Sequence, residues 1–251
     1  MTKRPLILIS NDDGVQAQGI QELTALMRQL GDVIVVAPDG PRSASSSCIS
    51  PAMPVTLRCL EQQEGLAIWQ CSGTPTDCVK LALEKVVPRK PDLMVSGINH
   101  GDNASVSLHY SGTVGAVKEA CMKQVPAVAF SLCTHRQQCD FRPYRPLVLD
   151  VASHVLAYGL PSDVMLNVNF PEVPRLAGVR VCRASRGDWR EEWLEEAPGT
   201  YHLTGTFVNL EPDATDTDVW ALDHAFASVT PLALDMTAYD LLSGHLKSLQ
   251  R

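Results

Sequence analysis

Two adjacent aspartates, Asp12 and Asp13, end the first apolar run of the chain, which begins at Pro5. Two carboxylates at the carboxyl end of a strand repel each other unless a cation lies between them. Since all their donor atoms are oxygens, they favour Mg²⁺, Mn²⁺ or Ca²⁺ over Zn²⁺. The alternative is a polar turn in which Asp13 caps the next helix and Gly14 relieves the backbone. The pair alone leaves a metal site and a turn both open.

Three further polar clusters follow predicted strands, at residues 38–47, 96–103 and 110–113. In a parallel sheet, loops at the carboxyl ends of strands share one edge, so these clusters can line one crevice with the Asp pair. Ser111, Gly112 and Thr113 lead into a predicted helix and offer hydroxyls and free N–H groups, which suit a phosphate. The alternative for them is an ordinary helix N-cap.

The elements that position these clusters alternate between strand and helix. Apolar residues at helical spacing and buried apolar runs predict helices over 20–30, 75–87, 112–123, 144–158 and 238–249, and strands over 33–37, 92–96, 127–132 and 165–170. This rhythm is typical of an α/β fold with a doubly wound, Rossmann-like parallel sheet in three layers. Residues 183–218 are acidic, Trp-rich and turn-rich. We therefore predict a single domain over 1–251, with a core of about 1–185 and a β-rich extension with a last helix over 186–251.

Charge and cysteine content exclude several classes of protein. The chain has 251 residues, 21 Lys and Arg against 28 Asp and Glu, and no basic stretch with interleaved aromatics, so polynucleotides and anionic membranes are not expected partners. Its eight cysteines form no CxxC pair and predict reduced core thiols, with Cys139 weakly exposed. No apolar run approaches the roughly 20 residues of a membrane span, and the N-terminal run is shorter than the core of a signal peptide. We expect a cytoplasmic protein.

Common catalytic and nucleotide-binding motifs are missing. Ile20 and Gln21 stand where a P-loop would have Lys and Ser or Thr, and no GxGxxG follows a predicted strand. A His-x-x-x-His zinc pair, a Gly-x-Ser-x-Gly elbow and a phosphoaspartyl DxDx motif are also absent from the ends of the predicted strands. The chemistry must therefore come from the converging polar loops.

Five motifs in these loops resemble the survival protein SurE family of 5′-nucleotidases. They are Ser-Asn-Asp-Asp-Gly-Val (10–15), Ala-Pro-Asp-x-x-Arg-Ser (37–43), Gly-Thr-Pro-Thr-Asp-Cys-Val (73–79), Pro-Asp-Leu-Met-Val-Ser-Gly-Ile-Asn-His-Gly-Asp-Asn (91–103) and Tyr-Ser-Gly-Thr-Val-Gly-Ala (110–116). Ser-Val-Thr-Pro-Leu (228–232) resembles the C-terminal strand of that family. The resemblance implies hydrolysis of nucleoside 5′-monophosphates, with 3′-monophosphates as a second substrate class, and a homodimer or homotetramer.

The resemblance also implies one divalent cation per subunit, Mg²⁺ or Mn²⁺, with Ca²⁺ as a substitute in crystals. By motif match its ligands are Asp12, Asp13, Ser43 and Asn99. Such an ion binds water and a phosphate oxygen, and Asp12 or Asp13 then accepts the proton. We predict that five residues hold the transferring phosphoryl group: Asn11, Asn103, Ser111, Gly112 and Thr113.

One position departs from the family pattern: Ala104 and Ser105 follow Asn103, where a further glycine is common. This difference affects the shape of the loop near the substrate and therefore the nucleotide preference. Residues 183–218 match the family motifs poorly, and for residues 216–218 the favoured interpretation is a solvated acidic turn. Several other candidates have structural interpretations that weigh as much as, or more than, functional ones. His100 and His109 either protonate a leaving group or form local hydrogen bonds, and Arg42 pairs either with phosphate or with a carboxylate. For Thr74-Pro75-Thr76-Asp77 a helix start is favoured, and for Trp189, Trp193 and Trp220 cover of the hydrophobic surface is favoured over base stacking.

Two other classes of protein compete with a phosphatase. A receiver-like switch also binds Mg²⁺ after its first strand, but it needs a Lys after its fifth, which Ser131-Leu132-Cys133 does not offer, and this chain is about twice the size. A metal-dependent, nucleotide-binding regulator without turnover has the same sequence features. The last helix carries an apolar stripe, Leu241, Leu242, Leu246 and Leu249, which either packs on its own sheet or crosses to a partner subunit.

Overall fold

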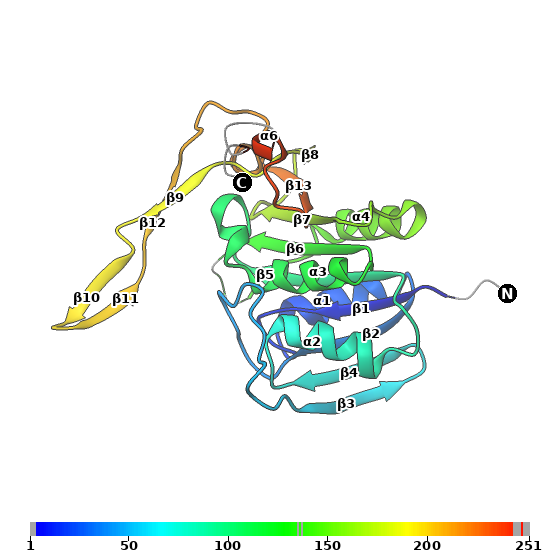
Figure 1. Cartoon of the computed structure of the whole chain (residues 1–251). Coiled ribbons are helices and arrows are strands. Elements are labelled where there is room, and N and C mark those ends of the chain that lie inside the picture. The colour runs from blue at the N-terminus through cyan, green and yellow to red at the C-terminus, as the bar shows by residue number, and fades with distance from the viewer. Residues whose placement is uncertain (1–3, 135, 137, 243–246, 248–251) are drawn as a thin grey trace.

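The computed structural model describes residues 4–134, 136, 138–242 and 247. Within them, nine strands form one sheet in the order β3-β4-β2-β1-β5-β6-β7-β13-β8 (Figure 1). The strands are β1 (Leu6–Ser10), β2 (Asp32–Pro38), β3 (Leu57–Gln63), β4 (Leu66–Cys71), β5 (Leu93–His100), β6 (Ala127–Cys133), β7 (Val164–Pro171), β8 (Gly178–Val181) and β13 (Phe226–Ala233). Most neighbours run parallel; the pairs β3–β4 and β7–β13 are antiparallel.

Helices cover both faces of this sheet. Helices α1 (Gln18–Met27) and α4 (Arg145–Tyr158) pack on one face. On the other lie α2 (Pro75–Leu81), its π-helical continuation η1 (Ala82–Val86), and α3 (Gly112–Met122). The short helix α5 (Asp218–Asp223) packs beside β7 and β13. The predicted three-layer, Rossmann-like α/β fold is therefore confirmed, as a mixed sheet that is mostly parallel.

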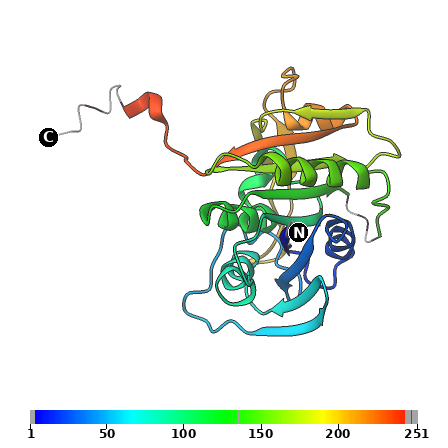
Figure 2. The same cartoon turned by 90° about the vertical axis from the view of Figure 1, so that its right-hand side faces the viewer.

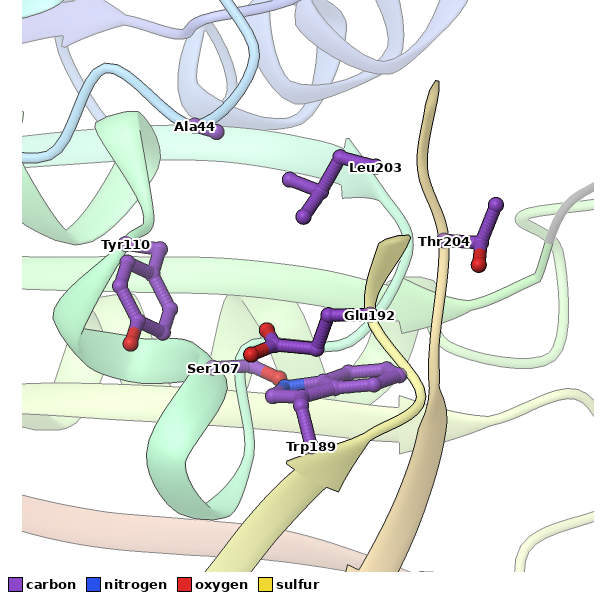
Figure 3. A pocket seen from close by; sticks show the side chains of 7 residues that line it. All are labelled: Ala44, Ser107, Tyr110, Trp189, Glu192, Leu203 and Thr204. Atoms are coloured by element: carbon purple, nitrogen blue, oxygen red, sulfur yellow. The ribbon is translucent and has the colours of Figure 1, made fainter. Parts of the chain in front are cut away.

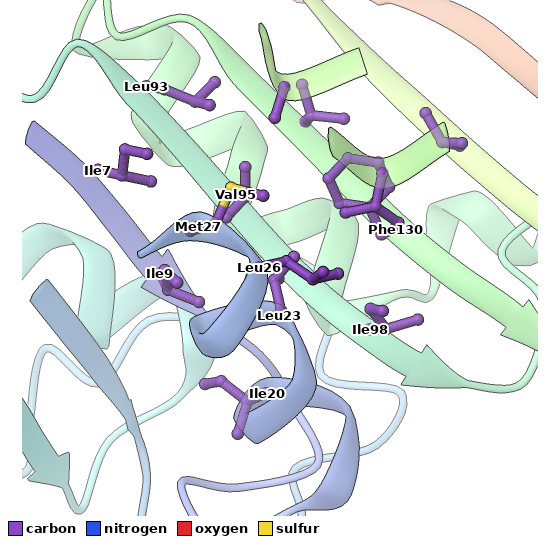
Figure 4. Packing of buried hydrophobic residues seen from close by; sticks show 14 of the residues in the cluster. Ile7, Ile9, Ile20, Leu23, Leu26, Met27, Leu93, Val95, Ile98 and Phe130 are labelled. Carbon is purple, nitrogen blue, oxygen red and sulfur yellow. The ribbon is translucent and has the colours of Figure 1, made fainter. Parts of the chain in front are cut away.

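Strand β1 shows why the apolar runs are continuous. Side chains alternate across a strand, so Ile7 and Ile9 enter the core under α1 and α4, while Leu6 and Leu8 enter the opposite core under α2 and α3. Figure 4 shows Ile7 and Ile9 beside the side chains of α1. Since helices cover both faces, every position of the strand is buried, and the usual polar alternation is lost.

The register of the parallel strands brings their carboxyl ends to one edge. Strand β1 lies between β2 and β5, with Ile7 opposite Val33 on one side and Leu93 on the other. The loops that follow these three strands, together with the 3₁₀ helix η2 (Ser105–His109) that leads into α3, therefore meet at this edge. They carry the polar clusters named above.

The hairpin of β3 and β4 was not predicted from the sequence. Strand β3 is a polar edge strand that is almost wholly exposed, so it has neither a buried run nor a clear alternation. The sequence signal for this hairpin was Gly65, which lies in the turn between the two strands and has a φ of +70°. A second difference is that β13 lies inside the main sheet, so the sequence after residue 186 also contributes to the core.

Two segments project from the body. The ribbons formed by β9 (Gly187–Arg190), β10 (Trp193–Ala197), β11 (Thr200–Leu203) and β12 (Thr206–Asn209) extend well beyond the sheet (Figure 1), and we call residues 187–209 the arm. After β13, the helix α6 (Tyr239–Leu242) stands off in another direction (Figure 2). The predicted helix 238–249 is described only in its first part, and Leu246 and Leu249 lie outside the described residues. Leu241 and Leu242 are exposed, so these two do not pack on their own sheet.

All eight cysteines have free thiols. Cys71, Cys78, Cys121 and Cys182 are buried, as predicted, and Cys139 is partly exposed. Cys48 and Cys59 are exposed, which corrects the prediction of core thiols: Cys48 lies on a loop and Cys59 on the exposed strand β3. Among the described residues, no helix is long and apolar enough to cross a membrane.

Candidate functional site

Asp12 lies at the centre of the crowded edge of the sheet. Asp12 is only 5% exposed, and its carboxylate accepts a hydrogen bond from the Thr113 hydroxyl. Burial raises the pKa of Asp12 to about 6; the bond from Thr113 acts against this rise, and the like charge of Asp13 adds to it. In the described part of the chain, no lysine or arginine forms an ion pair with either aspartate. A buried carboxylate next to a second carboxylate, with no lysine or arginine to balance their charge, favours the binding of a cation.

Asp13 faces the end of β5. Its Oδ2 accepts the His100 N–H at 3.3 Å and lies 3.6 Å from the His100 Nδ1. The His100 ring packs edge-on against Phe141, and its Nε2 is buried without a partner among the described residues. Asn99 is buried beside His100 and donates its side-chain amide to the Gly101 carbonyl at 2.9 Å, which leaves its side-chain oxygen available. Both predicted ligands therefore lie on neighbouring strand ends.

The start of α3 lies directly against Asp12. A Cβ added to Gly112 would lie 2.8 Å from the Asp12 Cβ and 2.5 Å from the Ser45 Oγ, so only glycine leaves enough room at this contact. The Ser111 hydroxyl accepts the Val114 N–H at 3.1 Å, which is the N-cap role weighed for it above. Because the first amides of a helix have no acceptor within it and Val114 already donates to Ser111, the amides of Gly112 and Thr113 are the ones available to an anion.

The loop after β2 closes the same edge. The Arg42 N–H donates to the Asp12 carbonyl at 2.7 Å, and the Ser46 N–H donates to the Tyr110 carbonyl at 3.0 Å. Ser43 follows Arg42 in this loop and is exposed, so its hydroxyl is open to solvent. The Arg42 side chain pairs with Asp39 at 2.8 Å, which is the structural ion pair weighed for it above.

Asn11 and Asn103 are buried and hold backbone in place. The Asn11 side chain donates to the Gly14 carbonyl at 2.9 Å and accepts the Gly14 N–H at 3.2 Å, which fixes the turn that presents the Asp pair. The Asn103 amide donates to the Ser131 Oγ at 2.7 Å. Their predicted contact with phosphate stays a prediction.

Asp218 corrects the expectation of a solvated acidic turn. It is fully buried and accepts the Ser105 N–H on one oxygen and the Ser185 N–H on the other, both at 2.8 Å. It therefore ties the turn before α3 to the base of the arm. The sequence signal was the helix start itself, since Thr217 caps α5 ahead of an apolar Val-Trp-Ala-Leu run. Thr74 likewise caps α2 through a reciprocal capping box with Asp77, as favoured from the sequence.

The predicted cation ligands fit this geometry by their chemistry. Within the described ranges, no cluster of three or more His, Cys, Asp and Glu side chains could hold a metal ion. The set Asp12, Asp13, Ser43 and Asn99 has two such residues and adds a hydroxyl and an amide oxygen. Two carboxylates, a hydroxyl and an amide oxygen offer oxygen donors alone, which suit a hard divalent cation.

Comparison with known proteins gives a consistent answer. The family model described as "Survival protein SurE" matches residues 7–191. The chain is 46% identical to 5′-nucleotidase SurE of Bacteroides thetaiotaomicron, over 99% of both chains, and 49% identical to 5′-nucleotidase SurE of Phocaeicola vulgatus, over 96% of this chain and 95% of the relative. The chain belongs to the SurE family. The crystal structure of the SurE protein from Aquifex aeolicus, 31% identical, superposes with a TM-score of 0.82 and covers 98% of this chain and 100% of that one.

The SurE family model ends at residue 191, inside the arm, whereas the relatives align almost to the end of the chain. The similarity to these SurE relatives therefore extends beyond the family model, into the sequence of the arm and of β13. The resemblance inferred from the five motifs is confirmed.

Proposed function

We propose that the edge of the sheet around Asp12 is the active site at which this chain acts as a 5′-nucleotidase, releasing phosphate from nucleoside 5′-monophosphates. The relatives that cover nearly its full length are named 5′-nucleotidases. The observation that carries the assignment to this edge is the buried Asp12 carboxylate. It lies against the first turn of α3 and receives the Thr113 hydroxyl, and no lysine or arginine of the described ranges pairs with it to balance its charge.

Asp12, Asp13, Ser43 and Asn99 would hold one divalent cation, Mg²⁺ or Mn²⁺. When bound, such an ion lowers the pKa of a coordinated water and offsets the negative charge of the transition state. Thr113 orients the Asp12 carboxylate through its hydroxyl, and the Asn99 amide is oriented by its bond to Gly101. Either Asp12 or Asp13 would take up a proton at this site.

The phosphoryl group would lie at the start of α3. The amides of Gly112 and Thr113 are oriented toward this edge by the helix, whose partial positive end attracts an anion. Ser111 holds the first turn through its cap, and Asn11 fixes the turn that faces it. Asn103 joins this edge to β6 through Ser131, which positions the loop between β5 and η2. We propose 3′-monophosphates as the secondary substrate class, because their phosphate lies at a different position relative to the base.

Phosphate release from AMP tests this assignment. Asp12→Asn and Asp13→Asn remove one charge each with little change in shape, so we expect turnover to fall by several orders of magnitude at saturating Mn²⁺, with the circular dichroism spectrum unchanged. Asp150→Asn is the matched control, because Asp150 lies on the exposed side of α4 and makes the same change of charge. Near-normal turnover in folded Asp12→Asn and Asp13→Asn variants would contradict the proposal. AMP binding without turnover in the unmodified protein would favour a regulator.

A further inference from the structure

A cavity of about 470 Å³ opens next to the proposed phosphate site. Its walls come from two parts of the chain that are far apart in sequence (Figure 3). Ala44, Ser107 and Tyr110 belong to the loops at the edge of the sheet, whereas Trp189, Glu192 and Leu203 belong to the arm. The volume lies within the range of about 300–1,000 Å³ that is usual for small-ligand sites.

Two residues of the cavity wall are sequence neighbours of residues in the proposed active site. Ala44 directly follows Ser43, and Tyr110 directly precedes Ser111. The Ser46 Oγ donates to the His109 carbonyl at 2.8 Å, which joins the loop after β2 to η2 beside the cavity. The cavity wall therefore lies one residue from Ser111, beside the start of α3 where we place the phosphate.

Two aromatic side chains, Tyr110 and Trp189, form opposite parts of the cavity wall (Figure 3). Trp189 is half-buried and is held edge-on by Phe207, with ring centroids 5.7 Å apart. Gly205 has a φ of +129°, and a Cβ there would lie 3.3 Å from the Trp189 ring, so the arm backbone passes close to the indole. Nucleobases stack on such aromatic faces, and purines, being larger, gain more from them.

One acidic side chain, Glu192, points into the cavity between these aromatics (Figure 3). Among the described residues its carboxylate has no hydrogen-bond or ion-pair partner, although its backbone carbonyl accepts the Thr204 N–H. An ionised carboxylate only accepts hydrogen bonds and can take two parallel N–H donors. Guanine offers such a pair at N1 and the 2-amino group, adenine and cytosine offer one amino group, and uracil offers one N–H between two repelling carbonyls.

We propose that this cavity is the base subsite of the enzyme, that Trp189 and Tyr110 stack the nucleobase, and that Glu192 selects guanine by accepting its two N–H donors. The inference rests on the proposed function, because it takes the bound molecule to be the nucleotide whose phosphate lies at α3. The arm is then part of the substrate site, although it projects from the body.

Steady-state hydrolysis of GMP, IMP, UMP and ribose 5-phosphate tests this subsite. Ribose 5-phosphate has no base, and IMP lacks only the 2-amino group of GMP. Since a hydrogen bond to a charged group changes binding by about 10- to 100-fold, Glu192→Gln should lower the ratio of kcat/KM for GMP over UMP by about that factor and remove the advantage of GMP over IMP. Trp189→Ala should raise KM for all three nucleotides about tenfold and leave ribose 5-phosphate unchanged. Glu196→Gln, on the arm but outside the cavity, is the matched control.

Calorimetric binding of guanosine separates a failed subsite from a failed active site, because guanosine carries no phosphate. The unmodified protein should bind guanosine, and Glu192→Gln and Trp189→Ala should bind it at least tenfold more weakly. An unchanged GMP to UMP ratio in Glu192→Gln, or equal losses for GMP and ribose 5-phosphate in Trp189→Ala, would overturn the subsite. Guanosine binding without hydrolysis of any monoester would support the subsite and contradict the proposed function.

Discussion

At the scale of single residues, the site depends on two kinds of contact: those between neighbours in sequence, and those between residues that only the fold brings together. The Asp12–Asp13 pair and the Ser-Gly-Thr start of α3 show their character in residue type and order alone. Asp218 does not, because its two oxygens meet N–H groups of Ser105 and Ser185, which lie 113 and 33 residues away. Its burial could be known only once the sheet had brought the arm beside η2.

Thr113 gives a prediction at this scale. Its hydroxyl donates to Asp12, so Thr113→Val should leave that carboxylate misoriented and less well satisfied. Because such supporting contacts usually change metal affinity or activity by about 10- to 100-fold, we expect more Mn²⁺ to be needed for half-maximal turnover. Titration of activity with Mn²⁺ measures this, and Thr113→Ser, which keeps the hydroxyl, should restore the unmodified curve. An unchanged Mn²⁺ requirement in Thr113→Val would show that the contact does not matter for the ion.

At the scale of elements, strands buried on both faces were predicted well, since helices on each side demand a continuous apolar run. Strand β3 was missed, and β9 to β12 were predicted only as a β-rich extension without strand bounds, because one or both of their faces meet solvent and their side chains carry little pattern. The same difference between central and exposed strands applies to the residues of the site. Its residues on central strand ends were found, while Trp189 and Glu192 on the arm were not assigned to the cavity that they line.

The first turn of α3 can be tested by closing the space at Gly112. A side chain there meets Asp12 and Ser45, so Gly112→Val should abolish most turnover and weaken inhibition by inorganic phosphate or vanadate. Gly40→Ala is the control, because a Cβ at Gly40 meets open space. Unchanged inhibition constants in a folded Gly112→Val variant would place the anion elsewhere.

The cap of α2 gives a stability prediction. Although burial alone would raise the pKa of Asp77, N–H donors from Thr74 and Ser50 lower it below the ordinary value of 3.8. Asp77→Asn should therefore cost about 1–2 kcal/mol in free energy of unfolding at pH 7. Because the folded pKa is depressed, this stabilisation is present above pH 3.8 and is lost as the pH falls through the folded value. Urea denaturation of both proteins from pH 7 to pH 3 should show the difference narrowing; a constant difference would assign the effect to packing.

At the scale of the whole molecule, β13 and β8 join the C-terminal sequence to the main sheet, which supports our proposal of one domain over 1–251. The two projecting segments, the arm and the segment after β13, have apolar side chains that no other part of the described chain buries. The arm exposes Trp193, Leu194 and Tyr201, and the C-terminal segment exposes Met236, Tyr239, Leu241 and Leu242. Apolar side chains gathered on extended segments are typical of subunit contacts, and we propose a homodimer or homotetramer that covers them.

Truncation tests this assembly, provided that the sheet is left whole. A cut at about residue 230 would remove half of β13, which pairs with both β7 and β8, and would unfold the edge of the sheet. A chain ending at Asp235 keeps β13 and loses only the projecting segment, so it should have a lower oligomer mass and a lower melting temperature together. Light scattering at micromolar concentration measures the mass. A single-chain mass for the unmodified protein would contradict the assembly, and an unchanged mass after truncation would assign the contact to the arm.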